Sequence, residues 1–202
     1  MSKKVGQLDP RVVRTRRLLR RAMINLVARE GYASLTVQQI TDEAGLNRAT
    51  FYLHYREKHD LLVEVFDELM AEVTPDPGES ESGKAFDPTR IVEVFEHVAG
   101  HADFYRVMLS EEGVPFFSSR VRSYVQEVVG RWFHWLQPDA ARVEVPLEIS
   151  IPFTAAAYLG AIVWWLEHDM PLKPQAIAEQ LILLTAQGVP RSLGLDPVRP
   201  AE

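Results

Sequence analysis

Apolar residues recur through most of this chain at spacings of three and four positions, which is the period of an amphipathic α-helix. A first helix is expected to begin between Asp9 and Thr15 and to run to about Glu30, with one such face consisting of Leu19, Met23, Leu26 and Val27. Within residues 58–73 a wider apolar stripe consists of Leu61, Leu62, Val65, Phe66, Leu69 and Met70. No segment alternates apolar and polar positions between turn signals, as a half-buried strand does. The pattern therefore predicts an all-α chain of about nine helices.

Turn-forming residues predict where these helices begin and end. Asp9 stands before Pro10, which is the form of a helix N-cap followed by proline at the first helical position. Residues 74–86 are rich in Pro, Gly, Ser and Glu and predict a flexible loop. Beyond this loop the predicted helices are residues 88–100, 103–110, 115–136, 146–168 and 174–188.

Residues 36–58 predict two short helices joined by a turn. The first opens at Thr36, and Gly45 supplies the positive φ that a tight turn requires. Asn47 is a good N-cap for a helix over residues 48–55. In that helix Phe51 and Tyr55 are expected to face inward, so the outward side is expected to carry Arg48, Ala49, Thr50, Tyr52 and Leu53.

Composition adds an asymmetry of charge. The 202 residues carry a net charge of −6. Residues 1–60 hold 12 Lys or Arg against 6 Asp or Glu, whereas residues 61–202 hold 10 against 22. A basic segment of this kind is typical of a small DNA-binding unit, although chance imbalance remains an alternative. There is no cysteine, which excludes disulfides, thiolate nucleophiles and cysteine-based zinc fingers.

The uncharged run over residues 149–166 is slightly short for a bilayer span of roughly 20 residues. It also contains a proline and a glycine, so a buried helix is predicted and no membrane association. The N-terminus has basic residues but no apolar run after them, and it is therefore not predicted to be a secretory signal. The expected location is the cytoplasm.

The helix-turn-helix pattern and its charge carry a family resemblance. Residues 14–62 contain LTVQQITDEAG followed by LNRATFYLHYREKHDLL. This quarter of the chain resembles the DNA-binding domain of the TetR family of transcriptional regulators. The resemblance implies DNA contacts by Thr36, Gln38, Asn47, Arg48, Ala49, Thr50, Tyr52, His54 and Lys58. Leu53 departs from the family, where many relatives have an aromatic or polar residue.

Among these, Thr36 is implied to bind a phosphate and Arg48 to form a bidentate contact with guanine. Tyr52 and His54 are implied phosphate contacts, and Lys58 is the implied anchor at the start of the following helix. Structural alternatives stay open for each. For Thr36 alone the alternative is an N-cap that needs no DNA, and a lone Arg or Lys is most often a solvated charge.

The acidic remainder is predicted to form a dimer and to bind a ligand. Helices at about residues 146–168 and 174–188 carry more apolar surface than one domain needs, and TetR-like proteins pair their last two long helices between subunits. Core packing is the alternative. His101, Phe104 and Trp132 are the preferred candidates for lining an effector pocket. His97 and His101 stand four residues apart, which is half of a metal site, but no metal site, cofactor or catalytic motif is predicted.

These inferences combine into one functional prediction. Residues 1–57 form the DNA-binding domain and residues 58–202 the ligand-binding and dimerisation domain. The chain is expected to be a repressor, not an enzyme, that binds a palindromic operator as a homodimer and is released by an unknown small-molecule effector. Two alternatives remain: a helical enzyme or ligand carrier with an ancillary basic head, and an effector-independent DNA-binding protein.

Overall fold

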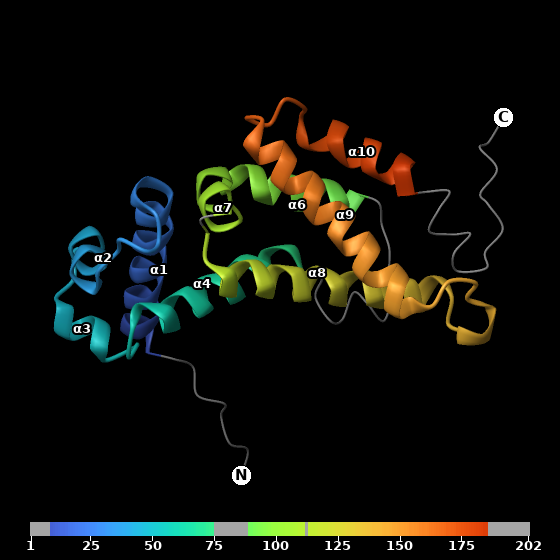
Figure 1. Cartoon of the computed structure of the whole chain (residues 1–202). Helices are drawn as coiled ribbons and strands as arrows, with labels where there is room; N and C mark the ends of the chain where they lie inside the picture. Colours follow the sequence, from blue (N-terminus) through green and yellow to red (C-terminus); the bar gives the residue numbers. More distant parts are fainter. Residues whose placement is uncertain (1–8, 75–88, 112, 186–202) are drawn as a thin grey trace, which may run out of the picture. The chain divides into compact units, whose positions relative to one another are not determined.

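The computed structural model describes residues 9–74, 89–111 and 113–185 (Figure 1). Within these ranges it contains nine α-helices, one short 3₁₀ turn and no strand, which confirms the all-α prediction. The helices are α1 Pro10–Glu30, α2 Val37–Glu43, α3 Arg48–Tyr52, α4 Lys58–Val73, α6 Thr89–Gly100, α7 Ala102–Met108, α8 Pro115–Leu136, α9 Leu147–Glu167 and α10 Pro174–Thr185. The 3₁₀ turn is Ala140–Arg142.

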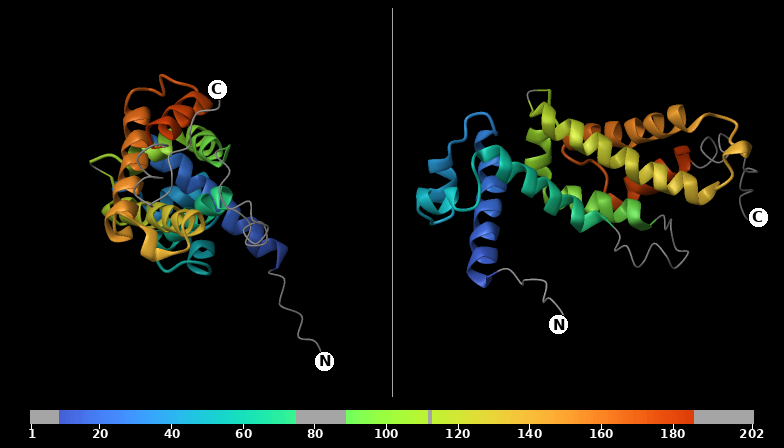
Figure 2. Two further views of the ribbon diagram at one scale, coloured as in Figure 1. Left: turned by 90° about the vertical axis from the view of Figure 1, so that its right-hand side faces the viewer. Right: turned by 90° about the horizontal axis from the view of Figure 1, so that it is seen from below.

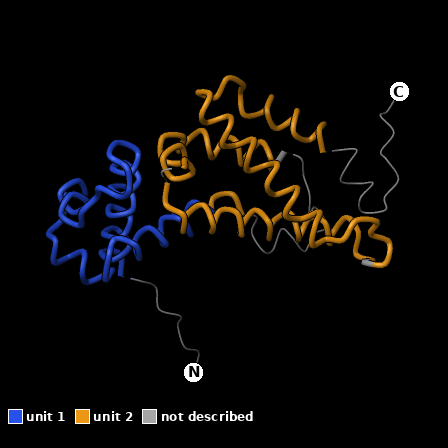
Figure 3. Tube along the Cα trace, viewed as in Figure 1, with its two compact units in different colours: residues 1–70 blue, residues 71–202 orange. Residues whose placement is uncertain are grey.

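The chain divides into two compact units, Met1–Met70 and Ala71–Glu202 (Figure 3). Helix α4 belongs to the first unit over most of its length, and its last residues belong to the second. The predicted functional boundary between residues 57 and 58 stays a prediction. Most of the predicted loop at 74–86 lies outside the described residues.

The first unit is built around α1, whose start and end follow the sequence signals. Asp9 caps the helix by accepting a hydrogen bond of 2.8 Å from the Arg11 backbone, and Pro10 occupies the first helical position. Gly31 ends it with φ of 75°, a value that favours glycine. Helix α2 packs on α1 and α3 packs on α2. The apolar faces predicted for the helices over 10–30 and 58–73 are buried, with Leu19, Met23, Leu26, Val27, Leu61, Leu62, Val65, Phe66, Leu69 and Met70 all in the core.

The second unit is a bundle in which α9 packs on α8 and on α7, and α10 packs on α6 (Figure 2). Phe95 and Trp165 meet edge to face with ring centroids 5.2 Å apart. In a second cluster, Val129 and Phe133 of α8 are buried together with Ala155 of α9. These contacts join segments far apart in the chain, so the long helices are held by their apolar faces rather than by local propensity.

The predicted end of α3 is wrong. The helix expected over residues 48–55 ends at Tyr52. The backbone then tightens, because Leu53 donates to Thr50 and His54 donates to Phe51, which are bonds to the third residue back. Phe51 and Tyr55 nevertheless point into the core, as predicted, with 0% and 5% of their surface exposed.

Candidate nucleic-acid interface

Helix α2 begins with a complete capping box. The Thr36 hydroxyl accepts a hydrogen bond from the Gln39 backbone at 3.2 Å, and the Gln39 side chain accepts one from the Thr36 backbone at 2.9 Å. Two of the backbone donors at the helix start are therefore satisfied without DNA. Thr36 is exposed, as is Gln38, whose amide donates to Asp42 at 2.7 Å. The capping role of Thr36 is observed, and its phosphate contact stays a prediction.

The turn between α2 and α3 places the start of α3 at the surface. Gly45 has φ of 65°, the left-handed conformation predicted for it. Asn47 caps α3 by accepting a bond of 2.8 Å from the Ala49 backbone. Asn47, Arg48 and Ala49 are exposed and Thr50 is half-buried. The start of α3 thus has side chains at the surface, and the buried Phe51 packs the helix against the core.

Arg48 and Tyr52 form a pair along the exposed side of α3. The Arg48 guanidinium donates to the Tyr52 hydroxyl at 3.2 Å and lies 5.7 Å from the centre of its ring. Tyr52 is 48% exposed and Leu53 is 80% exposed. This contact holds the long Arg48 side chain beside Tyr52. His54 is half-buried, with its ring 6.3 Å from that of Tyr55.

Lys58 is half-buried and binds backbone carbonyl groups of the first unit. Its ammonium donates to the carbonyl oxygens of Tyr32, Ala33 and Leu35 at 3.0, 3.2 and 2.8 Å. It also lies 4.5 Å from the centre of the Tyr32 ring, and burial lowers the pKa of Lys58. An ammonium has three N–H groups, so a phosphate contact would have to replace one of these bonds. The observed contacts favour a structural role for Lys58.

A half-buried ionic network, which was not predicted from the sequence, joins α1 to α4. Glu64 accepts hydrogen bonds from Arg16, Arg20 and the Tyr55 hydroxyl, and Arg20 also pairs with Glu68. Burial tends to raise the pKa of Glu64, but the bonds from the two guanidinium groups and Tyr55 outweigh it and hold that pKa below its ordinary value. Burial also raises the pKa of Tyr55 to about 12, so its hydroxyl stays protonated and donates. The signal in the sequence was a matched spacing: two arginines and two glutamates, each pair four residues apart on neighbouring helices.

The network leaves other basic side chains of α1 at the surface. Arg11, Arg14, Arg17 and Arg21 are exposed. Arg16 and Arg20, by contrast, are neutralised by glutamates of α4. Among the described residues of the first unit, exposed positive charge thus lies on α1 and on Arg48 and Arg56.

The three predicted pocket residues lie in different surroundings in the second unit. Phe104 is 1% exposed and packs edge to face on Phe117. Trp132 packs beside Phe133 in the cluster shared by α8 and α9. His101 lies near Glu72, 3.6 Å from its carboxylate. None of these contacts among the described residues brings the trio together, and its role in ligand binding stays a prediction.

Helix α9 has a continuous apolar stripe that the second unit leaves exposed. Ile149, Phe153 and Trp164 are 61%, 73% and 46% exposed. Small exposed residues lie between them on the same side of the helix, at Ala156, Ala157 and Gly160. Near the end of α10, Leu183 and Leu184 are 72% and 77% exposed. Among the described helices, α9 alone is long and apolar enough to cross a membrane, which is weak evidence of a span.

Comparisons with known proteins agree with this architecture. Residues 19–65 match the family model for bacterial regulatory proteins of the tetR family, and residues 89–187 match a transcriptional regulator C-terminal region. Together the two matches cover more than half of the chain. A 71-residue stretch is 41% identical to the HTH-type transcriptional regulator YxbF of Bacillus subtilis, covering 35% of this chain and 19% of that protein. The chain spans only 19% to 38% of the length of the curated relatives that it matches.

Solved structures share the fold over most of the chain. A TetR transcriptional regulator from Streptococcus agalactiae 2603V aligns with a TM-score of 0.66 at 21% identity, covering 86% of this chain and 94% of that one. NalD, the secondary repressor of the MexAB-OprM multidrug efflux pump in Pseudomonas aeruginosa, aligns with a TM-score of 0.61 at 21% identity, covering 92% and 98%. The helix-turn-helix unit, the helical second unit and both family matches lead to one assignment: the chain belongs to the TetR family of bacterial transcriptional regulators.

Proposed function

We propose that this protein is a homodimeric, cytoplasmic repressor that binds a palindromic operator through α2 and α3. The observation that carries the proposal is the exposed first turn of α3, with Arg48 directed outward on a helix that Phe51 anchors in the core. A helix-turn-helix protein reads bases with the N-terminal residues of its second helix. Repression is the function that the name of NalD, a protein of the same fold, describes.

The residues proposed to contact DNA follow from exposure and chemistry. Arg48 matches the O6 and N7 acceptors of guanine, and Ala49 suits contact with a thymine methyl group. Gln38 and Tyr52 are exposed and carry polar groups that suit base or phosphate contacts. Thr36, Asn47, Thr50 and His54 remain part of the proposed surface. Lys58 is better explained as a structural residue, because three carbonyl oxygens already accept its hydrogen bonds.

The proposed dimer uses the exposed stripe of α9 and the end of α10. Phe153 is 73% exposed and Leu184 77%, which is unfavourable for an isolated subunit in water. The small residues between Phe153 and Trp164 allow a second helix to approach closely. In a two-fold dimer the same stripe meets itself, so each subunit buries the other's apolar surface. Two heads would then bind half-sites one turn apart, about 34–36 Å along the duplex.

Release by a small-molecule effector completes the proposal. The effector would bind the second unit and favour a dimer arrangement with lower affinity for the operator. Two rival functions make different predictions. A helical enzyme or carrier would keep its activity after deletion of the first unit. An effector-independent DNA-binding protein would keep its operator affinity whatever small molecule is added.

Selection of bound sequences from a random DNA pool tests the central part of the proposal. The full-length protein is expected to enrich an inverted repeat. The Arg48→Ala variant is then expected to lose about 1–3 kcal/mol on that operator and to relax the preference at one base of each half-site. Equal losses on operator and random DNA would show that Arg48 does not read a base. Failure to enrich any sequence would refute operator recognition itself.

A further inference from the structure

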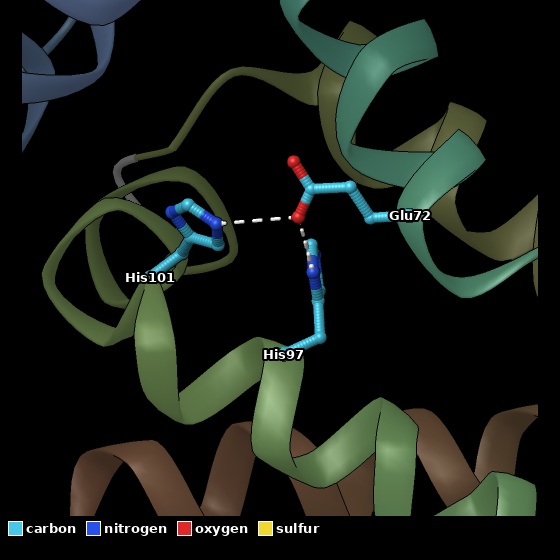
Figure 4. A group of neighbouring side chains, drawn as sticks. All are labelled: Glu72, His97 and His101. Atoms are coloured by element: carbon cyan, nitrogen blue, oxygen red, sulfur yellow. Dashed lines mark ion pairs between the residues drawn. The ribbon is translucent and has the colours of Figure 1, made fainter.

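Three metal-ligating side chains meet in the second unit (Figure 4). Glu72 lies in the last turn of α4, His97 in the last turn of α6, and His101 immediately before α7. One carboxylate oxygen of Glu72 lies 3.1 Å from Nδ1 of His97 and 3.6 Å from Nε2 of His101. The ligand atoms of all three residues lie within 4.8 Å of one another. Two imidazoles therefore point at the same oxygen of the same carboxylate.

The spacing of these atoms suits a small metal ion. A tetrahedral zinc ion with bonds of about 2.0–2.1 Å to nitrogen and oxygen holds its ligand atoms about 3.4 Å apart. The two distances to the Glu72 carboxylate lie on either side of that value. Two imidazoles and one carboxylate are ligands that zinc and similar transition metals accept, whereas magnesium and calcium prefer oxygen alone. The three residues supply three ligands and leave a fourth position for water or for another molecule.

The surroundings hold the ligands in place. Nε2 of His97, on the other side of its ring, lies 2.8 Å from the hydroxyl of Tyr105, which is 2% exposed. A metal-binding histidine usually donates its second N–H to an oxygen in this way, which fixes the ring and leaves the first nitrogen free to bind the ion. The end of α4 is held as well, because the Thr74 and Tyr124 hydroxyls lie 2.6 Å apart.

Access and charge distinguish a metal site from a simple ion pair. His97 is 7% exposed in its side chain, His101 29% and Glu72 50%, so an ion can reach the cluster from solvent. The two imidazole ring centres lie 5.0 Å apart, and a single carboxylate faces both rings. A divalent ion takes both imidazoles in their neutral form and is partly neutralised by the carboxylate.

We infer that Glu72, His97 and His101 form a binding site for a divalent transition-metal ion of the zinc class. The site takes one ion per chain and is open at its fourth position. It goes beyond the proposed function and does not depend on it, because it is defined by side chains of the second unit alone.

Isothermal titration of the metal-free, full-length protein with zinc chloride tests the inference. One saturable site per chain is expected, with little heat from magnesium chloride. Glu72→Gln and His101→Ala are each expected to weaken zinc binding at least 10-fold. Both changes spare the fold, because Glu72 is half exposed and His101 makes no side-chain bond to the helix that it precedes. Tyr105→Phe, a change to a positioning residue, is expected to weaken binding about 10–100-fold.

His134→Ala is the matched control, because His134 is an exposed histidine of α8 outside the cluster. It is expected to leave zinc binding unchanged. Tryptophan fluorescence checks the fold of every variant, since all four tryptophans lie in the second unit. The titration extends to a zinc concentration 100 times that of the protein, about 1 mM zinc for 10 μM protein. If zinc binding does not saturate within this range, the site is overturned. Equal zinc affinity in the Glu72→Gln, His101→Ala and unaltered proteins would overturn it as well.

Discussion

The ionic network around Glu64 gives a prediction whose size follows from the structure. Glu64→Gln keeps the shape of the side chain but removes the charge that holds Arg16 and Arg20. A hydrogen bond to a charged group contributes about 1.5–3 kcal/mol, and breaking a fully buried ion pair costs about 3–5 kcal/mol. Glu64 is 17% exposed and Arg16 35%, so water offsets part of this loss. We expect the first unit to lose about 2 kcal/mol of stability, which is about 30-fold in its opening constant.

Hydrogen exchange measures the stability lost by the first unit separately from the stability of the second unit. Peptides from α1 and α4 are expected to lose about 30-fold in protection at pH 7. Tryptophan fluorescence is expected to stay unchanged, because all four tryptophans lie in the second unit. Glu68→Gln is the matched control: Glu68 also pairs with Arg20 but is 43% exposed, so its loss should cost less than about 1 kcal/mol.

The pH dependence provides a second check with a definite sign. The pKa of Glu64 is lower in the folded protein than its ordinary value of 4.5, so its stabilisation is present above that value. The stabilisation is lost as the pH falls through the lower, folded pKa. The difference between wild type and Glu64→Gln should therefore be constant from pH 7 to about 5 and shrink below about 4.5. A difference below about 0.5 kcal/mol at pH 7, or one that grows as the pH falls, would refute the reasoning.

Three further predictions concern single residues. Lys58→Met should destabilise the 31–36 segment by about 1.5–3 kcal/mol, as measured by hydrogen exchange. It should leave the salt dependence of operator binding unchanged. A salt slope lower by about one would instead indicate that Lys58 contacts a phosphate. Phe153→Glu should raise the dimer dissociation constant at least about 100-fold in sedimentation analysis, because a two-fold dimer carries the change in both subunits. Leu53→Glu, which changes an exposed residue of the first unit, should leave the dimer dissociation constant unchanged. Gly45→Ala should cost about 1–2 kcal/mol in thermal unfolding, since φ of 65° strains any side chain there; an unchanged midpoint would contradict this.

Much of the fold could be predicted from local signals. The stripe from Leu61 to Met70 specifies which face of α4 is buried, and such periodicity is visible without knowing the partner. Asp9 and Asn47 form caps with residues two positions away, so the sequence contains both partners. The end of α3 was harder to predict, because its last turn closes with bonds from Leu53 and His54 to the third residue back.

The parts that could not be predicted depend on partners far along the chain. Lys58 bonds to carbonyl oxygens 23 to 26 residues earlier, and Glu64 bonds to Arg16 across 48 residues. The cluster around His97 was missed for the same reason. Asp103, which is close to both histidines in sequence, pairs with Arg106, and the carboxylate that reaches the histidines comes from Glu72 on another helix.

The most direct test of the central claim is the affinity of the full-length protein for its selected palindrome, compared with a scrambled duplex of the same length and at the same salt concentration. Fluorescence anisotropy is expected to show binding to the palindrome at least about 1,000-fold tighter. Two chains should bind each duplex, and a single half-site should bind more weakly. Equal affinity for the palindrome and the scrambled duplex would contradict a protein that recognises an operator through α2 and α3.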